Sequence, residues 1–261
     1  MKKFYIFIFL LTIPFTLASC KPAFSSENSS KPRNITVSAA SSLKDALIEI
    51  QPKFEKENNI KLTFNLEASG ILQKQIEEGA PVDLFISAGN KQIDELEKKN
   101  LIDRSSKINL LKNKLVLIVG NDYKDKIKSV TDLVTIKDKI SMGNPLTVPA
   151  GQYAKESLQY LKLMDKLSDK IVPAKDVKQV VTYVENNEVA AGIVFKSDAT
   201  TIKHSFILLT FAENSHNPIV YPAALINNSK EKEAGNKFLQ YLSSSDAQKI
   251  FKKYGFEIYE K

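Results

Sequence analysis

Short runs of apolar residues alternate with segments in which apolar residues recur every three or four positions, from residue 35 to near the C-terminus. The first run is Ile35–Val37, which predicts a buried strand. The spacing that follows is helical and is set by four apolar residues, Leu43, Ala46, Leu47 and Ile50. The pattern therefore predicts a strand that leads through a turn of small residues into the start of a helix.

The same alternation repeats along the chain. Strands are predicted at 35–37, 60–66, 82–87, 115–119, 140–142, 171–173, 191–195, 207–209 and 219–226. Helices are predicted at 43–50, 71–78, 93–99, 153–161, 177–186, 230–242 and 245–254, with a polar helix or loop at 123–133. This order of elements predicts the α/β fold class with mostly parallel sheets.

The pattern at the N-terminus predicts an export signal. Two lysines precede the apolar run Phe4–Leu11, and Leu-Ala-Ser-Cys follows at 17–20. This predicts a signal peptide at 1–19 and lipidation of Cys20, as in a bacterial lipobox. An uncleaved membrane anchor is the alternative, but polar and proline residues interrupt the run, which is short for a span. Residues 20–33 are rich in Ser, Pro, Lys and Asn, which predicts a flexible tether behind the lipidated cysteine.

The amino-acid composition excludes or disfavours several classes of functional site. Cys20 is the only cysteine, which excludes a disulfide, a cysteine metal cluster or a thiol nucleophile in the mature domain. The formal charge of +7 falls to +5 when residues 1–19, with two lysines and no acid, are removed. The lysines are spread over predicted helix faces, so nucleic-acid binding is not expected. The roughly 225 residues after the tether suffice for one large or two small domains.

Four predicted strands or loops end in small or polar residues directly before a helix. These turns contain Ser41-Ser42, Glu67–Gly70, Pro149–Gln152 and Ala174–Val177. A helix N-terminus offers unpaired N–H groups and the positive end of the dipole, which together favour an anion. Ser, Asp and Gly are also ordinary capping residues. Taken alone, the turns leave a structural and an anion-binding interpretation open.

Other candidate residues favour structural roles. The sequence has no Gly-x-Ser-x-Gly elbow and no phosphate-binding Gly-x4-Gly-Lys-Ser/Thr loop, so no enzyme activity is predicted. His204 and His216 lack a ligand spacing and are expected at the surface. Asp83 and Asp198 follow strands and are expected to make capping or inter-element hydrogen bonds rather than to act as acid or base. Tyr221 is expected to pack at a hinge.

Six segments together resemble a known family. They are 35–43, Gln-Ile-Glu-Glu-Gly-Ala-Pro-Val-Asp-Leu-Phe-Ile-Ser-Ala at 75–88, Val-Pro-Ala-Gly-Gln-Tyr-Ala at 148–154, 173–177, 192–199 and 251–256. In order and spacing the chain resembles the substrate-binding proteins of bacterial molybdate ABC importers over nearly all of 34–257. The resemblance implies a type II periplasmic-binding-protein fold, with two α/β lobes joined by two crossing strands. The implied first lobe is 34–115 plus 221–261, and the second is 116–220.

The resemblance also implies a binding site. Ser42 and Ser69 match serine ligands of the oxyanion, and Ala150 and Val177 match backbone N–H donors. Molybdenum would therefore be held as molybdate through these neutral groups, with no cofactor. Phe195 stands where enterobacterial members have a tyrosine whose hydroxyl bonds the ligand, and phenylalanine has no donor. Tungstate is expected to bind as well.

The implied role is that of an extracytoplasmic, lipid-anchored receptor. It would close around molybdate and deliver it to a membrane permease that works with an ATPase. We expect a monomer. Two alternatives remain open from the sequence: a receptor for another oxyanion such as sulfate or phosphate, and a non-transport surface lipoprotein on the same fold.

Overall fold

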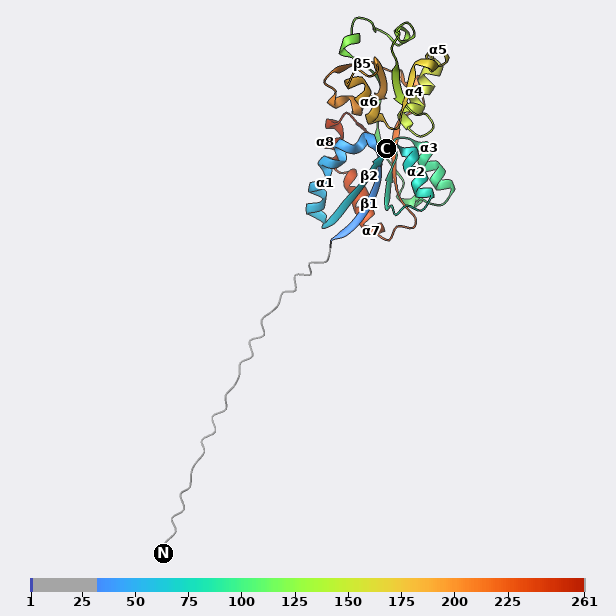
Figure 1. The fold of residues 1–261 in the computed structure, drawn as a ribbon. Helices are drawn as coiled ribbons and strands as arrows, with labels where there is room; N and C mark the ends of the chain where they lie inside the picture. Colours follow the sequence, from blue (N-terminus) through green and yellow to red (C-terminus); the bar gives the residue numbers. More distant parts are fainter. Residues whose placement is uncertain (2–31, 261) are drawn as a thin grey trace. The chain divides into compact units, whose positions relative to one another are not determined.

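The computed structural model describes Met1 and residues 32–260 (Figure 1). The predicted signal peptide, Cys20 and all but the end of the predicted tether lie outside these described residues. Residues from Pro32 onward form one compact unit. Within the described residues, no helix has the length and apolar character needed to cross a membrane.

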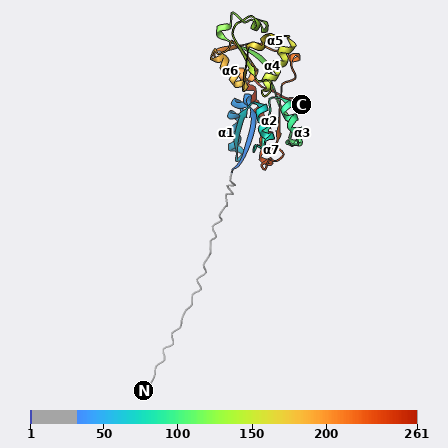
Figure 2. The same ribbon diagram turned by 45° about the vertical axis from the view of Figure 1, so that its right-hand side comes forward.

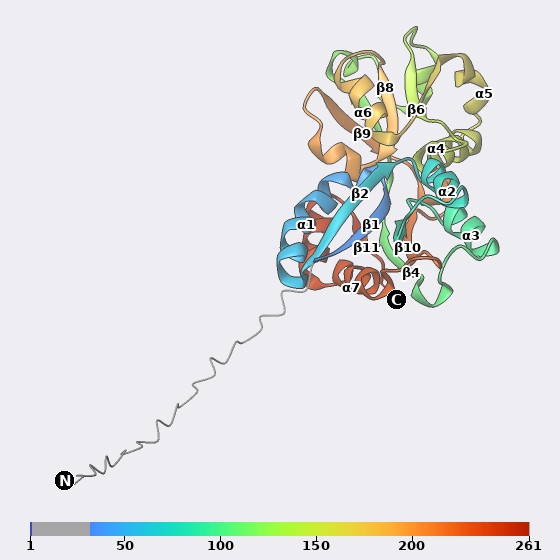
Figure 3. The same ribbon diagram turned by 60° about the horizontal axis from the view of Figure 1, so that its bottom comes forward.

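Two β-sheets organise this unit, as Figure 3 shows. The six-stranded sheet has the order β11-β4-β10-β3-β1-β2, with β1 at Arg33–Ala40, β2 at Ile60–Glu67, β3 at Leu84–Ile86, β4 at Ile108–Lys112, β10 at Val220–Leu225 and β11 at Glu257–Ile258. The five-stranded sheet has the order β7-β6-β8-β5-β9, with β5 at Leu115–Gly120, β6 at Ile140–Gly143, β7 at Ile171–Ala174, β8 at Ala191–Phe195 and β9 at Ser205–Thr210. We call the first sheet with its helices lobe 1 and the second with its helices lobe 2.

Each sheet has its own helices, which form two groups in Figures 1 and 2. Lobe 1 carries α1 at Lys44–Asn58, α2 at Ser69–Glu77, α3 at Asn90–Lys98, α7 at Lys232–Leu242 and α8 at Ser245–Lys253. Lobe 2 carries α4 at Pro149–Tyr160, α5 at Met164–Leu167 and α6 at Val177–Glu185. The apolar stripe predicted after residue 43 is the buried face of α1, where Leu47, Ile50 and Phe54 are fully buried. Phe54 packs against Phe238 of α7, with the ring centroids 4.8 Å apart.

The sheets are mixed, so the prediction of mostly parallel sheets was wrong. Five of the nine strand pairings are antiparallel. Strands β1, β2 and β3 run parallel because helices connect them, as do β6, β7 and β8. The strands that follow a passage between lobes, β5 and β10, run against these parallel sets.

The chain passes between the lobes twice. It leaves lobe 1 after β4 and enters lobe 2 with β5, so residues 113–114 make the first passage. It returns between the end of β9 and the start of β10, through residues 211–219. The predicted crossing strands at 115–119 and 219–226 therefore adjoin these two passages. Each is a full member of one sheet, since β5 pairs only within lobe 2 and β10 only within lobe 1.

Three short elements were not predicted from the sequence. They are β4, α5 and β11. The sequence of β4, Ile-Asn-Leu-Leu-Lys, has no clear alternation, and the strand is held between β10 and β11. The polar segment at 123–133 forms 3₁₀ turns at Asn121–Tyr123 and Val130–Val134 rather than an α-helix. Strands β4 and β11 form because they pair with other strands of the sheet, and a local sequence pattern does not predict such pairing.

The start of α4 is fixed by a close backbone contact. A Cβ atom on Gly151 would lie 1.9 Å from the carbonyl oxygen of Gly143, at the end of β6. Only glycine lets the first turn of α4 pack directly on the end of this strand. The position of Ala150, one residue earlier, depends on this contact.

We expect Gly151→Ala to destabilise the protein by about 1–3 kcal/mol, because the added methyl group overlaps backbone that cannot rotate away. Urea denaturation of both proteins measures the change in the free energy of unfolding. Lys155→Ala, at an exposed position one turn later in α4, is the matched control and should leave stability within about 0.5 kcal/mol. Equal stability of the glycine and alanine proteins would contradict the packing argument.

Candidate functional site

A small pocket between the lobes contains all five binding residues expected from the sequence. Ser42 and Ser69 come from lobe 1, and Ala150, Val177 and Phe195 come from lobe 2. The other lining residues are Ala40, Ser41, Glu67, Ala68, Ala88, Val148 and Pro149. The cavity measures about 10 Å³, close to the space of one water molecule. A tetrahedral oxyanion could therefore enter only when the lobes move apart.

Three helices begin at this pocket without a capping side chain. Their N-cap residues are Ala40, Ala68 and Val148, and none of them makes a side-chain cap hydrogen bond. Serine, threonine, aspartate or asparagine normally occupies this position. Because these caps are apolar, they offer the N–H groups of the first turns no side-chain acceptor, so an N–H that also lacks a backbone acceptor can bond an anion in the pocket.

Helices α4 and α6 of lobe 2 begin at the pocket in different ways, and only α4 lacks a capping side chain. In α4, Pro149 has no N–H, and the first N–H that bonds within the helix is that of Gln152, to Val148 at 3.0 Å. The N–H of Ala150 comes before it. In α6, the Asp176 carboxylate caps the helix by accepting from the N–H of Gln179 at 2.8 Å. This cap does not use the N–H of Val177, the first residue of the helix.

Ser69 is held with its hydroxyl hydrogen available. Its Oγ accepts a hydrogen bond from the N–H of Ala88 at 3.0 Å, and the side chain is fully buried. A hydroxyl that accepts from an N–H can still donate its own hydrogen. Ser69 can therefore act as a donor toward the pocket that it lines.

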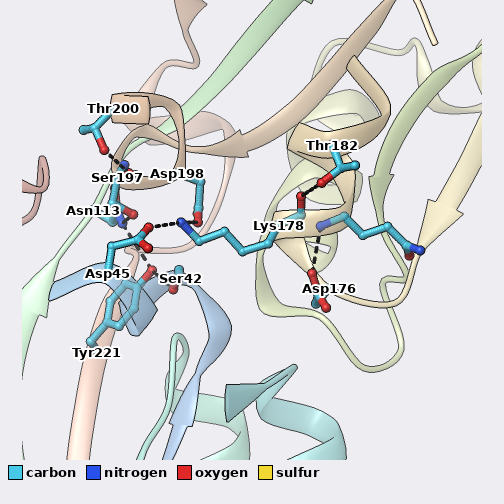
Figure 4. Close-up of polar contacts among 11 residues, drawn as sticks. Ser42, Asp45, Asn113, Asp176, Lys178, Thr182, Ser197, Asp198, Thr200 and Tyr221 are labelled. Carbon is cyan, nitrogen blue, oxygen red and sulfur yellow. Dashed lines mark hydrogen bonds and ion pairs between the residues drawn. The ribbon is translucent and has the colours of Figure 1, made fainter. Parts of the chain in front are cut away.

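Ser42 belongs to a buried chain of hydrogen bonds, drawn in Figure 4. Its Oγ lies 3.0 Å from the Oη of Tyr221, which lies 3.2 Å from Nδ2 of Asn113. The same Nδ2 is 2.9 Å from Oγ of Ser197. Burial raises the pKa of Tyr221 well above its ordinary value, and the nearby Asp198 carboxylate adds to the rise. The phenol stays protonated at any physiological pH.

Tyr221 has a larger role than the sequence suggested. Its ring packs against Phe195 and Phe256, with centroids 5.8 and 5.4 Å apart, which agrees with the expected hinge packing. Its hydroxyl in addition bonds a residue that lines the pocket. Local sequence could not reveal this bond, because Ser42 and Tyr221 are 179 residues apart.

Phe195 contributes a ring and no polar group to the pocket. It lies between Tyr153 and Tyr221, with ring centroids 6.2 and 5.8 Å away. Burial raises the pKa of Tyr153, so this phenol also stays protonated. An aromatic row thus forms one wall beside the pocket.

Lys178, next to Val177, connects the lobes. Its Nζ lies 2.7 Å from Oδ2 of Asp45 in α1 and 3.4 Å from Oδ1 of Asp198 (Figure 4). Burial lowers the pKa of Lys178, but the Asp198 and Asp45 carboxylates outweigh it and raise the pKa above its ordinary value. The Lys178 and Asp45 side chains are 26% and 37% exposed, so the pair contributes about 1 kcal/mol or less to holding the lobes together.

The two aspartates singled out in the sequence differ. Asp83 makes the expected structural hydrogen bonds, accepting from the N–H of Thr36 at 2.8 Å and from the hydroxyl of Ser229 at 2.6 Å. Asp198 does not: it is fully buried, and neither oxygen has a hydrogen-bond partner among the described residues. Its contact is the ion pair with Lys178. Burial raises the pKa of Asp198 to about 6, with Lys178 opposing the rise.

The lobes also meet through backbone. The N–H of Gly70, in the first turn of α2, donates to the carbonyl of Thr147 just before α4, at 2.9 Å. A Cβ on Gly70 would lie 2.6 Å from that oxygen. Glycine at this position allows the two helix starts to approach each other across the pocket.

Sequence reasoning missed several of these residues. Glu67 and Gly70 lie in one of the predicted turns, and Lys178 directly follows another. The sequence did not indicate a functional role for any of the three. The apolar caps at Ala40, Ala68 and Val148 were the available signal, because helix starts without a capping side chain are candidate anion sites.

The two histidines lie in different surroundings. His204 is exposed, and His216 is half-buried against the Tyr153 ring, 5.8 Å away. The part of the chain that the structure describes contains no group of three or more His, Cys, Asp or Glu side chains that could hold a metal ion.

This fold and pocket agree with a match over almost the whole described chain. Residues 35–257 match the family described as bacterial extracellular solute-binding protein. The chain belongs to this family. YvgL of Bacillus subtilis (strain 168), provisionally named an ABC transporter substrate-binding lipoprotein, is 42% identical over 256 residues, which is 98% of each chain. The family assignment confirms the solute-binding class expected from the resemblance.

Several relatives, including the following two, are named for molybdenum or molybdate. The molybdate-binding protein ModA of Escherichia coli (strain K12) is 40% identical over 232 residues, covering 86% of this chain and 89% of that protein. A solved structure from Clostridium difficile, provisionally named as the substrate-binding domain of a molybdenum ABC transporter, is 43% identical with a TM-score of 0.68. It covers 87% of this chain and 99% of that one. These likenesses confirm the periplasmic-binding fold with two lobes.

We expect Gly70→Ala to break the backbone bond between the lobes. To reach ordinary van der Waals separation from Thr147, the added methyl group must push the two backbones apart by about 1 Å. Amide hydrogen exchange at residue 70 should then become at least about tenfold faster, since its N–H loses its acceptor. Leu72, whose N–H bonds Ala68 within lobe 1, is the internal control and should keep its protection. Unchanged exchange at residue 70 would contradict a close approach of the lobes here.

We also expect Asp198 to make stability depend on pH. The folded pKa of about 6 exceeds the ordinary value of 3.8, so the folded state retains a proton that the unfolded state has lost between these pH values. The contribution of Asp198 is therefore most favourable below pH 4 and is lost as pH rises through 6, by about 3 kcal/mol. Lys178 faces this carboxyl with Asp45 and Asp176 nearby, and Lys178 stays charged across this range.

Urea denaturation of wild type and Asp198→Asn at pH 4 and pH 7 tests this expectation. The stability of the variant relative to wild type should increase from pH 4 to pH 7, because asparagine carries no charge at either pH. Other carboxylates titrate equally in both proteins and cancel in the comparison. A difference in stability that stays constant with pH would show that Asp198 titrates normally.

Proposed function

We propose that this protein is an extracytoplasmic receptor that binds molybdate, and tungstate with it, between its lobes and delivers the anion to an ABC permease. One observation carries the proposal. Two serine hydroxyls and three helix starts without capping side chains gather at one pocket between the lobes, in a chain 40% identical to a molybdate-binding protein. Such donors suit a dehydrated oxyanion, which must be hydrogen-bonded at every oxygen to be buried.

The proposed contacts come from both lobes. Ser42 and Ser69 would donate from lobe 1, and the N–H groups of Ala150 and Val177 from lobe 2. An anion that bonds both lobes stabilises only the arrangement in which they are close, so binding favours closure. We propose that the moving bodies are 34–115 with 221–261 and 116–220. The closed form would be the one that docks on the permease.

Phe195 modifies this site. It offers the anion no hydrogen bond, so the four donors and any water must satisfy it. Relative to a receptor with one more donor, the loss of a hydrogen bond to a charged ligand costs about 1.5–3 kcal/mol. We expect the protein to bind molybdate more weakly than a tyrosine-bearing relative.

The remaining features of the proposal concern the protein's location and partners. Export with a signal peptide at 1–19 and lipidation of Cys20 would anchor the receptor to the membrane, in line with the lipoprotein name of YvgL. The receptor would act as a monomer with the permease and its ATPase, and would itself catalyse no reaction.

Isothermal titration calorimetry of residues 32–261, which include the compact unit, tests the proposal. Molybdate and tungstate should bind, and sulfate and phosphate should not. Ser42→Ala and Ser69→Ala should each weaken molybdate binding about tenfold or more, because each removes a hydrogen bond to a charged ligand.

Ser157→Ala is the matched control for these variants. Ser157 is a fully buried serine in α4 that bonds Ser215 at 3.0 Å and does not line the pocket. Its replacement should leave the affinity unchanged. Binding of sulfate or phosphate in place of molybdate would favour a receptor for another oxyanion, and the absence of all binding would favour a surface lipoprotein without a transport role.

A further inference from the structure

The orientation of the Asn113 side chain is fixed by its backbone neighbours. Its Oδ1 accepts from the N–H of Lys114 at 2.9 Å and from the N–H of Ser197 at 3.4 Å. A backbone N–H can only donate, so the amide oxygen must face these two groups. The amide nitrogen therefore faces the other way, toward Ser197 Oγ and Tyr221 Oη, and donates to both.

This orientation sets the direction of the next hydrogen bond. Tyr221 Oη accepts from Asn113, and its other partner among the described residues is Ser42 Oγ. The tyrosine is fully buried, with 0% exposure. If Ser42 donated to it, the phenol hydrogen would have no acceptor, which costs about 1–3 kcal/mol for a buried group. The arrangement that satisfies every group has Tyr221 donating to Ser42.

We propose that Asn113 and Tyr221 are positioning residues, which make Ser42 an obligatory hydrogen-bond donor to the pocket. Ser42 Oγ accepts from Tyr221, so its own hydrogen is not used in that bond and is available to an anion in the pocket that the residue lines. The proposal rests on the proposed function, because it assigns the origin of one donor of that site. It adds two residues that do not line the pocket themselves.

The chain of donors also joins the parts of the protein that meet at the passage between lobes. Asn113 lies in the passage, Ser197 follows β8 of lobe 2, and Tyr221 is in β10 of lobe 1 (Figure 4). Successive hydrogen bonds of one direction polarise each other, which strengthens the last donor. Ser69 provides a contrast, since its hydroxyl is oriented by the backbone N–H of Ala88 and does not depend on this chain.

Tyr221→Phe removes the hydroxyl and keeps the ring that packs on Phe195 and Phe256. We expect a molybdate affinity about three- to tenfold weaker, the range of one net hydrogen bond. Asn113→Asp should have a larger effect, because a carboxylate can only accept. Tyr221 would then donate to the carboxylate, Ser42 would donate to Tyr221, and a lone pair of Ser42 would meet the anion.

Double-variant cycles separate orientation from general damage. In a Ser42→Ala background, Tyr221→Phe should have almost no further effect on affinity, since the hydroxyl that it orients is gone. In a Ser69→Ala background it should have its full three- to tenfold effect. Part of the Asn113→Asp effect should likewise vanish in a Tyr221→Phe background, and the remainder is repulsion between the new carboxylate and the anion. Full affinity of Tyr221→Phe, or the same factor in both serine backgrounds, would overturn the proposal.

Neutron diffraction of the deuterated protein tests the same proposal without any ligand. The deuterium between the two hydroxyls should be bonded to Tyr221 Oη and point at Ser42 Oγ. A deuterium on Ser42 that points at Tyr221 would overturn the assignment whichever anion the protein binds. A failure of molybdate binding together with the expected deuterium position would contradict the proposed ligand and leave the orientation of Ser42 established.

Discussion

The unpaired N–H groups at the helix starts are the constraint on which the site depends. A helix must satisfy the donors of its first turn, and most helices do so with a polar cap. Here the caps at Ala40, Ala68 and Val148 have no side chain that can accept. Bringing these starts together in one buried pocket is costly unless an acceptor joins them there. An oxyanion supplies several acceptors at once, which explains why apolar caps and a binding role belong together.

The close approach of the lobes follows from the same geometry. The donors come from helices of both sheets, so they can converge only when α2 and α4 begin almost in contact. Gly70 and Gly151 make that contact sterically feasible, one between the lobes and the other between α4 and its own sheet. The partly exposed ion pair of Lys178 and Asp45 adds little by comparison. The anion itself would be the main stabiliser of closure, as a receptor that must also open requires.

The sequence predicted the α/β class and most strands and helices, because apolar periodicity is a local property. The turns alone left a structural and an anion-binding interpretation open, and it was the family resemblance that implied which residues meet at the pocket. The sequence could not predict β4 or β11, whose existence depends on pairing with distant strands. The sequence did not predict the roles of Tyr221 and Asp198, for a related reason. The role of Tyr221 depends on its contact with Ser42, far away in the sequence. The role of Asp198 depends on its contact with Lys178, which lies on another element.

The charges around the pocket show why oriented neutral donors matter so much. Lys178 follows Val177 directly, but its charge is already matched by Asp45 and by the buried Asp198. Glu67 lines the pocket as well. With one ammonium against these carboxylates, the local formal charge does not attract a dianion. Affinity must then come from hydrogen bonds of correct direction, so a serine that presented a lone pair in place of its hydrogen would repel the ligand. The fixed amide of Asn113 prevents this reversal from a position outside the pocket.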